Sequence, residues 1–150
     1  MALSRRAEIT TLIAEELKKI NGETSTFDAL YTNNVNIFNN SFRRLKFLDE
    51  INDFPTICVN AGVENRIYDT FGLTTGELNI IIRAYVRDED PITLAENLAD
   101  DIEHVIYNLG DRSDIGVLDI TVESVSTDEG LATPFGILEV EILARYQLNI

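Results

Sequence analysis

Hydrophobic residues recur every three or four positions near the start of the chain, and this spacing predicts an amphipathic helix over about residues 4–20. Ser4 is the expected N-cap. Asn21-Gly22 follows the last apolar position and should end the helix. Its apolar stripe consists of Ile9, Leu12, Ile13, Leu17 and Ile20.

A second helical pattern covers residues 91–109. Asp90 is a good N-cap, and Pro91 suits the first helical position, where a missing N–H costs nothing. Gly110 is the expected residue just beyond the C-terminus. The predicted stripe consists of Ile92, Ala95, Leu98, Ala99, Ile102, Val105, Ile106 and Leu109.

Alternating apolar and polar residues predict strands in the rest of the chain. Short ones are expected at 55–62, entering a glycine turn, and at 65–71, and longer ones at 77–86, 117–125 and 137–148. The residues expected to face the core are Leu78, Ile80, Ile82, Ala84, Val86, Leu118, Ile120, Val122, Leu138, Val140, Ile142, Ala144, Tyr146 and Leu148.

This order of elements predicts one α+β domain over residues 1–150, a mainly antiparallel β-sheet with helices packed on one face. The core covers about 54–148. The segment 23–53 is the least regular part, with a candidate strand at Val35–Phe38 and a candidate short helix within 41–51 carrying Phe42, Leu45 and Leu48.

The second face of the predicted sheet mixes apolar and charged residues, whereas a solvated antiparallel face is normally more polar. This pattern favours a surface that contacts other subunits. Partial cover by the segment 23–53 would explain it equally well. The residues concerned are Ile81, Arg83, Tyr85, Arg87, Glu123, Ile137, Glu139, Glu141, Leu143 and Arg145.

The net charge of −14 is distributed unevenly. Residues 1–50 carry seven basic and seven acidic groups, whereas residues 51–150 carry five basic and nineteen acidic groups. Because nucleic-acid affinity depends on neutralising phosphates, ordinary DNA or RNA binding is excluded. The chain has no apolar stretch of transmembrane length and no secretory signal, so we expect a cytoplasmic protein without membrane contact.

Catalytic or metal chemistry finds little support in the sequence. The single cysteine, Cys58, lies in an apolar run without basic neighbours and is interpreted as a buried core residue. Acidic residues around His104, namely Glu96, Asp100 and Glu103, share a helix face that should point to solvent. We expect no catalytic residue, metal or cofactor. A small metal-dependent enzyme using the helix 91–109 and the run "RDED" at 87–90 is the alternative from a different class.

Several motifs after residue 47 resemble the tail terminator (tail-completion) proteins of tailed bacteriophages. They are "FLDEINDFP", "FPTICVNAGVENRIYDT", "LNIIIRAYVRDEDPITLAENLADDIEHVI" and "TDEGLATPFGILEVEILARY", in this order. The resemblance covers about residues 47–148. Its most specific part is the "TDEG…PFG" loop that leads into a final alternating strand ending in Arg-Tyr.

The resemblance implies a homo-oligomer, a hexameric ring that caps the tail tube, stops its polymerisation and offers a docking surface to the neck or connector. A sheath would be a further partner in a contractile tail. DNA would pass through the ring without specific binding. The expected location is the head-proximal end of the virion tail, after assembly in the host cytoplasm. Another neck or head–tail joining ring is the alternative within this class.

Candidate residues follow from combining the resemblance with the mixed sheet face. Subunit contacts are expected from Ile81, Arg83, Tyr85, Arg87, Ile137, Leu143 and Arg145. If this face lines the ring, the residues facing the hole are Asp119, Glu123, Glu139 and Glu141. Docking to other tail or neck proteins is expected from Arg43, Arg44, Lys46, Leu131 and Phe135, because loops on a rigid scaffold usually carry contacts.

Overall fold

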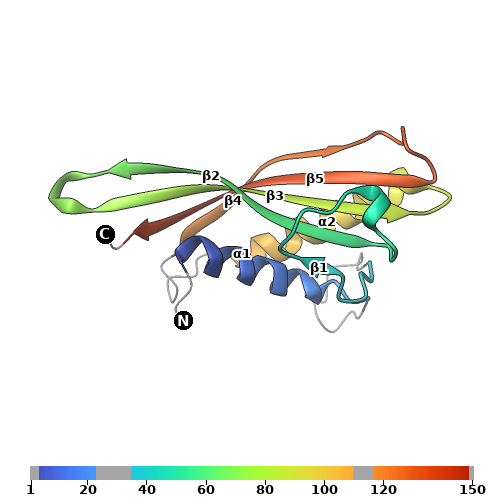
Figure 1. Cartoon of the computed structure of the whole chain (residues 1–150), viewed down its shortest axis with the longest axis horizontal. Coiled ribbons are helices and arrows are strands. Elements are labelled where there is room, and N and C mark those ends of the chain that lie inside the picture. The colour runs from blue at the N-terminus through green and yellow to red at the C-terminus, as the bar shows by residue number, and fades with distance from the viewer. Residues whose placement is uncertain (1–3, 23–34, 110–116, 149–150) are drawn as a thin grey trace.

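The structure, a computed structural model, describes residues 4–22, 35–109 and 117–148. Five strands, two α-helices and three short 3₁₀ helices make up these ranges (Figure 1). In chain order they are α1 (Arg5–Glu16), η1 (Leu17–Lys19), β1 (Ser41–Phe42), η3 (Leu48–Glu50), β2 (Thr56–Tyr68), η4 (Thr70–Gly72), β3 (Thr74–Arg87), α2 (Pro91–Leu109), β4 (Val117–Thr127) and β5 (Phe135–Leu148).

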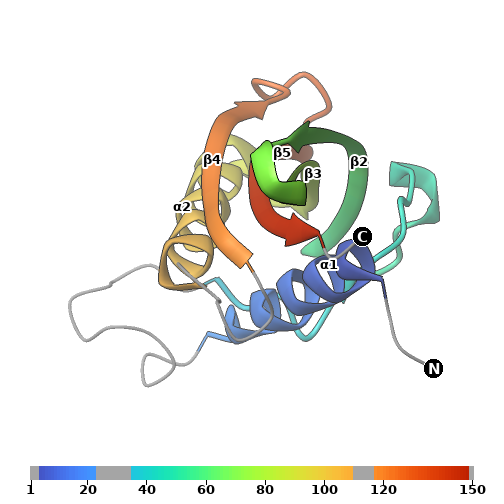
Figure 2. The same ribbon diagram turned by 90° about the vertical axis from the view of Figure 1, so that its left-hand side faces the viewer.

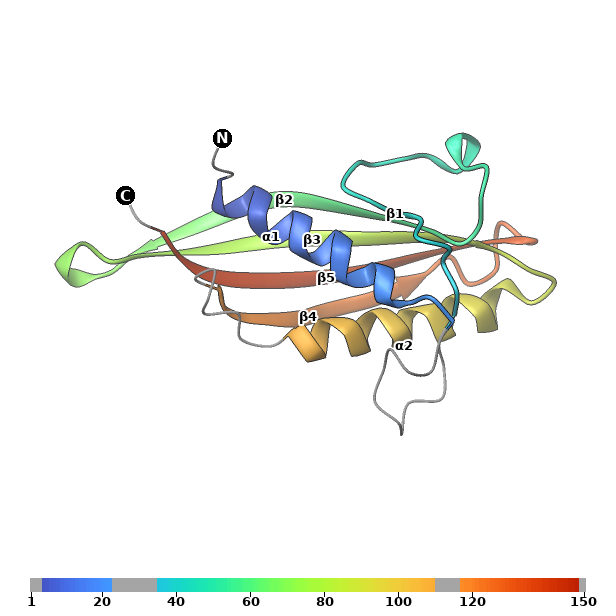
Figure 3. The ribbon, with the colours of Figure 1, turned by 90° about the horizontal axis from the view of Figure 1, so that it is seen from below.

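The strands form one sheet in the order β1-β2-β3-β5-β4. The short strand β1 pairs parallel to β2, and all other pairs are antiparallel. Both α-helices lie on the same face of the sheet, as the view from below shows (Figure 3). The predicted α+β class, a mainly antiparallel sheet with helices on one face, is therefore confirmed.

The two helices begin where their capping residues predicted. The Ser4 hydroxyl accepts a hydrogen bond from the Ala7 N–H at 3.2 Å, and an Asp90 carboxylate oxygen accepts one from the Thr93 N–H, also at 3.2 Å. Such caps satisfy N–H groups that have no partner inside the helix. The predicted C-terminal residue of α2, Gly110, lies outside the described residues.

The main core lies between the helices and the inward face of β3 and β5. Every second residue of β3 from Leu78 to Val86 is fully buried, and so is every second residue of β5 from Leu138 to Tyr146. Each large aliphatic side chain buried in this way contributes roughly 1.5–3 kcal/mol. The alternation predicted for these strands is therefore confirmed.

Two glycines allow close packing at opposite ends of this core. Gly136 lies under the start of α2, where a Cβ would come within 2.8 Å of Val86 Cγ2 and 3.2 Å of Pro91 Cβ. Gly76 is the cross-strand partner of Tyr146, whose ring would lie 2.7 Å from a Cβ at this position. A larger residue at either position would displace the side chain that covers it.

The structure corrects several predictions about individual strands. The two short strands at 55–62 and 65–71 are one strand, β2, in which a bulge between Ala61 and Glu64 replaces the predicted glycine turn. Two bulges also interrupt β4. Because a bulge shifts the alternation by one residue, Leu118 is 47% exposed instead of buried. Val122 faces the core side but is exposed because β4 is an edge strand.

The segment before β2 also differs from the prediction. Residues 41–51 form β1 and the 3₁₀ helix η3 instead of a short α-helix, and Phe42 and Leu45 do not enter the main core. The candidate strand Val35–Phe38 forms only an isolated bridge between Asn21 and Asn36. A local sequence pattern does not show with which distant strand a segment pairs, so it could not distinguish a helix from a short strand here.

The acidic side of α2 contains an exception that the helical pattern missed. Asp101 is 0% exposed, and its carboxylate accepts a hydrogen bond from the Val35 N–H at 2.7 Å. Ile92, which was predicted to belong to the apolar stripe, is exposed instead. The helix therefore contacts the segment before β1 through a buried carboxylate.

Candidate functional site

The face of the sheet opposite the helices is called the outer face here, and it comprises the outward-facing residues of β3, β5 and β4. The register brings oppositely charged residues together on it: Arg83 lies opposite Glu139, and Arg145 lies opposite both Glu77 and Asp119. Ile81 lies opposite Glu141, and Asn79 lies opposite Leu143. The residues predicted for subunit contact and for lining a ring are therefore interleaved on one surface.

Two of the three arginines of the outer face, Arg83 and Arg145, are paired with acids within the chain. The Arg83 guanidinium donates two hydrogen bonds to Glu139, one of them at 2.8 Å. The Arg145 guanidinium lies 3.4 Å from Asp119 and 3.9 Å from Glu77. Glu141 accepts a hydrogen bond from Ser124. These pairs neutralise Arg83 and Arg145, while Arg87 lies over the Phe135 ring. With Glu77, Asp119, Glu139 and Glu141 against three arginines, the outer face is slightly acidic on balance.

One end of the outer face is covered by residues 46–54. Ile51, Cys58 and Tyr85 form a small buried cluster there, with Leu48, Phe54 and Ile137 packed against it. Tyr85 is 3% exposed and donates a hydrogen bond to the Lys46 carbonyl at 2.6 Å. Partial cover by the segment 23–53 therefore explains the burial of Tyr85 and Ile137. The prediction that Tyr85 contacts another copy is wrong, because residues of its own chain bury it.

Cys58 belongs to this covered cluster and is fully buried, as its apolar surroundings predicted. Burial raises the pKa of the Cys58 thiol, although the backbone and charge of Lys46 act in the opposite direction. A thiol with a raised pKa forms little thiolate and is a poor nucleophile.

The predicted docking residues all lie near one end of the molecule. Arg43 is exposed, Arg44 pairs with Glu50 at 2.9 Å, and the Lys46 ammonium lies 4.0 Å from the centre of the Phe42 ring. Leu131, in the turn between β4 and β5, is 91% exposed.

Phe135 joins these loops into one surface. Its ring centre lies 5.5 Å from that of Phe54, and the Arg87 guanidinium lies over the same ring. The β4–β5 turn, the β3–α2 connection and η3 all gather at this end (Figure 1).

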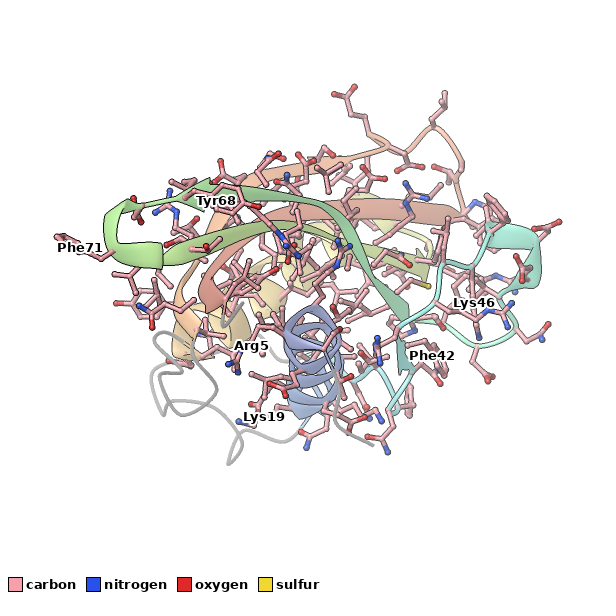
Figure 4. The ribbon with its side chains drawn as sticks, turned by 60° about the vertical axis from the view of Figure 1, so that its left-hand side comes forward. Arg5, Lys19, Phe42, Lys46, Tyr68 and Phe71 are labelled. Atoms are coloured by element: carbon pink, nitrogen blue, oxygen red, sulfur yellow. The ribbon has the colours of Figure 1, made fainter. Side chains whose placement is uncertain are left out.

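The opposite end of the molecule is formed by the tip of the β2–β3 hairpin, which sequence reasoning had missed. Phe71 is 99% exposed and projects away from the protein, and Tyr68 is exposed near it (Figure 4). Phe71 has a φ of 67°, a left-handed conformation that is uncommon for a bulky residue. The local signal was a phenylalanine directly before Gly72, which had been interpreted as the end of a strand.

A partly buried hydrogen-bond network ties this hairpin to β5. The Tyr146 hydroxyl donates to Glu64 of β2, and the Arg66 guanidinium donates to the other oxygen of the same carboxylate at 3.0 Å. Burial by itself raises the pKa of Glu64, but the hydrogen bonds from Tyr146 and Arg66 outweigh it, so the pKa is lowered from its ordinary value of 4.5. Burial and the bond to Glu64 raise the pKa of Tyr146.

The lowered pKa of Glu64 predicts a loss of stability in acid. A carboxyl group whose pKa is lower in the folded state stabilises the fold above its unfolded pKa, and this contribution disappears as the pH falls through the folded value. We expect Glu64→Gln to lower the free energy of unfolding by about 1 kcal/mol at pH 7. The difference from the unaltered protein should shrink steadily below pH 4.5. Urea unfolding between pH 7 and pH 3 measures this; a difference that stays constant over the range would refute it.

The acidic helix face around His104 forms only a shallow hollow. Asp100, Glu103, His104 and Tyr107 line it, with a volume of about 240 Å³. Within residues 4–22, 35–109 and 117–148, no group of three or more histidine, cysteine, aspartate or glutamate side chains is arranged to hold a metal ion. No helix in these ranges is long and apolar enough to cross a membrane.

An α+β domain with a slightly acidic sheet face and with exposed apolar side chains at both ends is typical of a structural protein that works in a larger assembly. Comparison with known proteins identifies that assembly. The family model of the bacteriophage tail tube terminator proteins matches residues 3–149. The tail tube terminator protein p142 of Escherichia phage T5 is 32% identical over 124 residues, which cover 75% of this chain and 77% of that protein. The chain therefore belongs to the bacteriophage tail tube terminator family and is a tail-terminating structural protein of a phage.

Proposed function

We propose that the chain forms a hexameric ring on the head-proximal end of the completed tail tube, where it stops tube polymerisation and provides the surface on which the neck or connector docks. The family and the name of the T5 relative support the terminating role. The acidic outer face is the observation that supports a ring around the DNA path, because a channel wall must not retain phosphates.

In this proposal the outer face lines the hole. Asp119, Glu139 and Glu141 lie on the outer face, and Glu123 is exposed beside a bulge of β4. Arg83 and Arg145 are paired with acids of their own chain and offer little to a passing phosphate. Ile81 and Leu143 are partly buried among these pairs and add apolar surface. Charge repulsion from such a wall would let DNA move through without sticking.

The two ends of the molecule would then contact different partners. One end carries the docking residues Arg43, Arg44, Lys46, Leu131 and Phe135, with Arg87 beside them. The other carries the hairpin tip with Phe71. A terminator must contact the tail tube on one side and the neck on the other, so two exposed surfaces at opposite ends suit this role. We assign one end to the tube protein and the other to the neck or connector.

The proposal predicts control of tail length. Inactivating the gene in the phage or prophage that encodes this chain should give tails of uncontrolled length without attached heads, and supplying the protein should restore a uniform length. Electron micrographs of the particles measure both. Tails of normal length that only lack heads would instead identify a neck or head–tail joining ring, and a uniform length without the protein would exclude the terminating role.

A further inference from the structure

The sheet has two open edges. On one side β1 pairs only with Ile57 and Cys58 of β2, so β2 from Val59 to Tyr68 has no neighbouring strand in the described parts of the chain. Of this stretch, the Gly62 carbonyl accepts a hydrogen bond from the Arg6 guanidinium at 2.7 Å. On the other side β4 is the edge strand over its whole length among the described residues.

Both edges carry exposed apolar side chains. They are Val63, Ile67 and Tyr68 on β2, and Leu118, Val122 and Val125 on β4. An exposed edge strand with apolar side chains is a template for pairing with another chain, and soluble proteins normally cover it or protect it with charges. In β4 the bulges leave two regular runs, Asp119–Val122 and Ser124–Thr127, that could still pair.

The two edges differ in charge. Neither α2 nor β4 contains a lysine or arginine, and the acids on this side include Glu96, Glu103 and Glu123. The side with β2 instead has mixed charge: it carries Arg6, Arg66 and the cluster at 43–46, and within it Arg66 pairs with Glu64 and Arg44 with Glu50. Figure 2 shows β4 and α2 on one side of the molecule, with β2 and the segment around η3 on the other. Two β4 edges would repel each other, whereas the mixed charge of the β2 side lets a β4 edge approach it without this repulsion.

Strand direction also favours contact between unlike edges. Since β2, β3, β5 and β4 are antiparallel in turn, β2 and β4 of one subunit run in opposite directions. Rotation about an axis along the strands keeps these directions, so β4 of one copy would meet β2 of the next as an antiparallel neighbour. A contact between two different surfaces of the same chain is heterologous, and repeated rotation closes it into a ring.

We propose that the β4 edge of one copy pairs with the β2 edge of the next, with the acidic side around α2 facing the side of mixed charge around β2. The proposal rests on the ring of the proposed function and specifies its subunit contact. In this arrangement the contact between subunits lies at the two sheet edges instead of on the outer face, where the sequence had predicted it. The outer face is then free to line the hole.

Two edge-blocked variants test this pairing. Val122→Lys/Val125→Lys blocks β4, and Val63→Lys/Ile67→Lys blocks β2. All four residues are exposed, and lysine on an edge strand is a natural protection against pairing, so both variants should fold. Tyr107→Lys is the matched control, since it replaces an exposed apolar residue on α2, outside both edge strands and both docking ends. Circular dichroism melts of each variant verify folding.

Chemical cross-linking, in solution and on isolated tail tubes, measures the assembly. We expect the unaltered chain and Tyr107→Lys to give species up to the full ring, and each edge-blocked variant alone to give only monomers. An equal mixture of the two variants should form a dimer and nothing larger. The open β2 edge of the β4-blocked variant can pair with the open β4 edge of the β2-blocked variant, and the remaining edge of each is blocked. This dimer also shows that the variants are folded.

Other outcomes overturn the proposal in distinguishable ways. Full rings from either blocked variant would place the contact elsewhere, while the proposed ring itself would stand. Dimers from one blocked variant alone would indicate contact between two like edges. Failure of the unaltered chain to form rings even on tail tubes would remove the ring of the proposed function, and this inference with it.

Discussion

Replacing Tyr146 with alanine should lower the free energy of unfolding by about 3–5 kcal/mol, because removal of a large buried aromatic side chain leaves a cavity in the core. Tyr146 is fully buried, its ring covers Gly76, and its hydroxyl bonds to Glu64 across the intervening strand. The substitution removes the packing and the hydrogen bond together. Chemical denaturation followed by circular dichroism gives the difference.

Tyr146→Phe is the matched control for this prediction. It keeps the ring over Gly76 and removes only the hydroxyl, so the expected loss is about 1.5–3 kcal/mol, the range for a hydrogen bond to a charged group. A loss below about 1 kcal/mol for the alanine variant would show that Tyr146 does not join the hairpin to the core as described.

Asp101→Ala should destabilise the protein by roughly 2–3 kcal/mol, although the residue lies in a helix whose other acids are mostly exposed. Its carboxylate is fully buried and accepts the Val35 N–H at 2.7 Å. Without the Asp101 carboxylate, the Val35 N–H loses this hydrogen bond at a partly buried position, where water is a poor substitute for the carboxylate. Thermal and urea unfolding of the purified variant measure the loss.

Glu96→Ala is the comparison for Asp101, since Glu96 lies on the exposed side of the same helix. An exposed substitution of this kind changes stability by no more than about 0.5 kcal/mol. Equal effects of the two substitutions would contradict the structural role of Asp101. Asp101→Asn should fall between them, because an amide oxygen can still accept the hydrogen bond without the charge.

Only some features of the outer face could be predicted from the sequence. Alternation correctly separated inward from outward residues on β3 and β5, so the mixture of Ile81, Arg83 and Glu139 on one surface could be predicted. The pattern could not tell which part of that surface was covered. Tyr85 proved to be buried by residues distant in sequence, and a local pattern contains no information about such contacts.

The local sequence pattern also did not predict the exposed hairpin tip or the open sheet edges, on which the proposed assembly depends. From the sequence alone, Phe71 is interpreted as the end of a strand. Its exposure becomes evident only from the path of the chain through the hairpin. Open edges depend on strand order, which is a property of the whole sheet. The two bulges of β4 changed the exposure of Leu118 for the same reason, since they arise from its pairing with β5.

The sequence by itself determined the two capped helices, the long alternating strands, the α+β class, the acidity and the likeness to tail terminators. These depend on periodicity, on capping groups within a turn of the helix and on total charge, all of which act over short distances or over the whole chain. Only the tertiary structure decided where Asp101 is buried, how Glu64 meets Tyr146, and which edges stay open. Each of these joins segments far apart in the chain, and long-range packing overrides the local preferences of the residues involved.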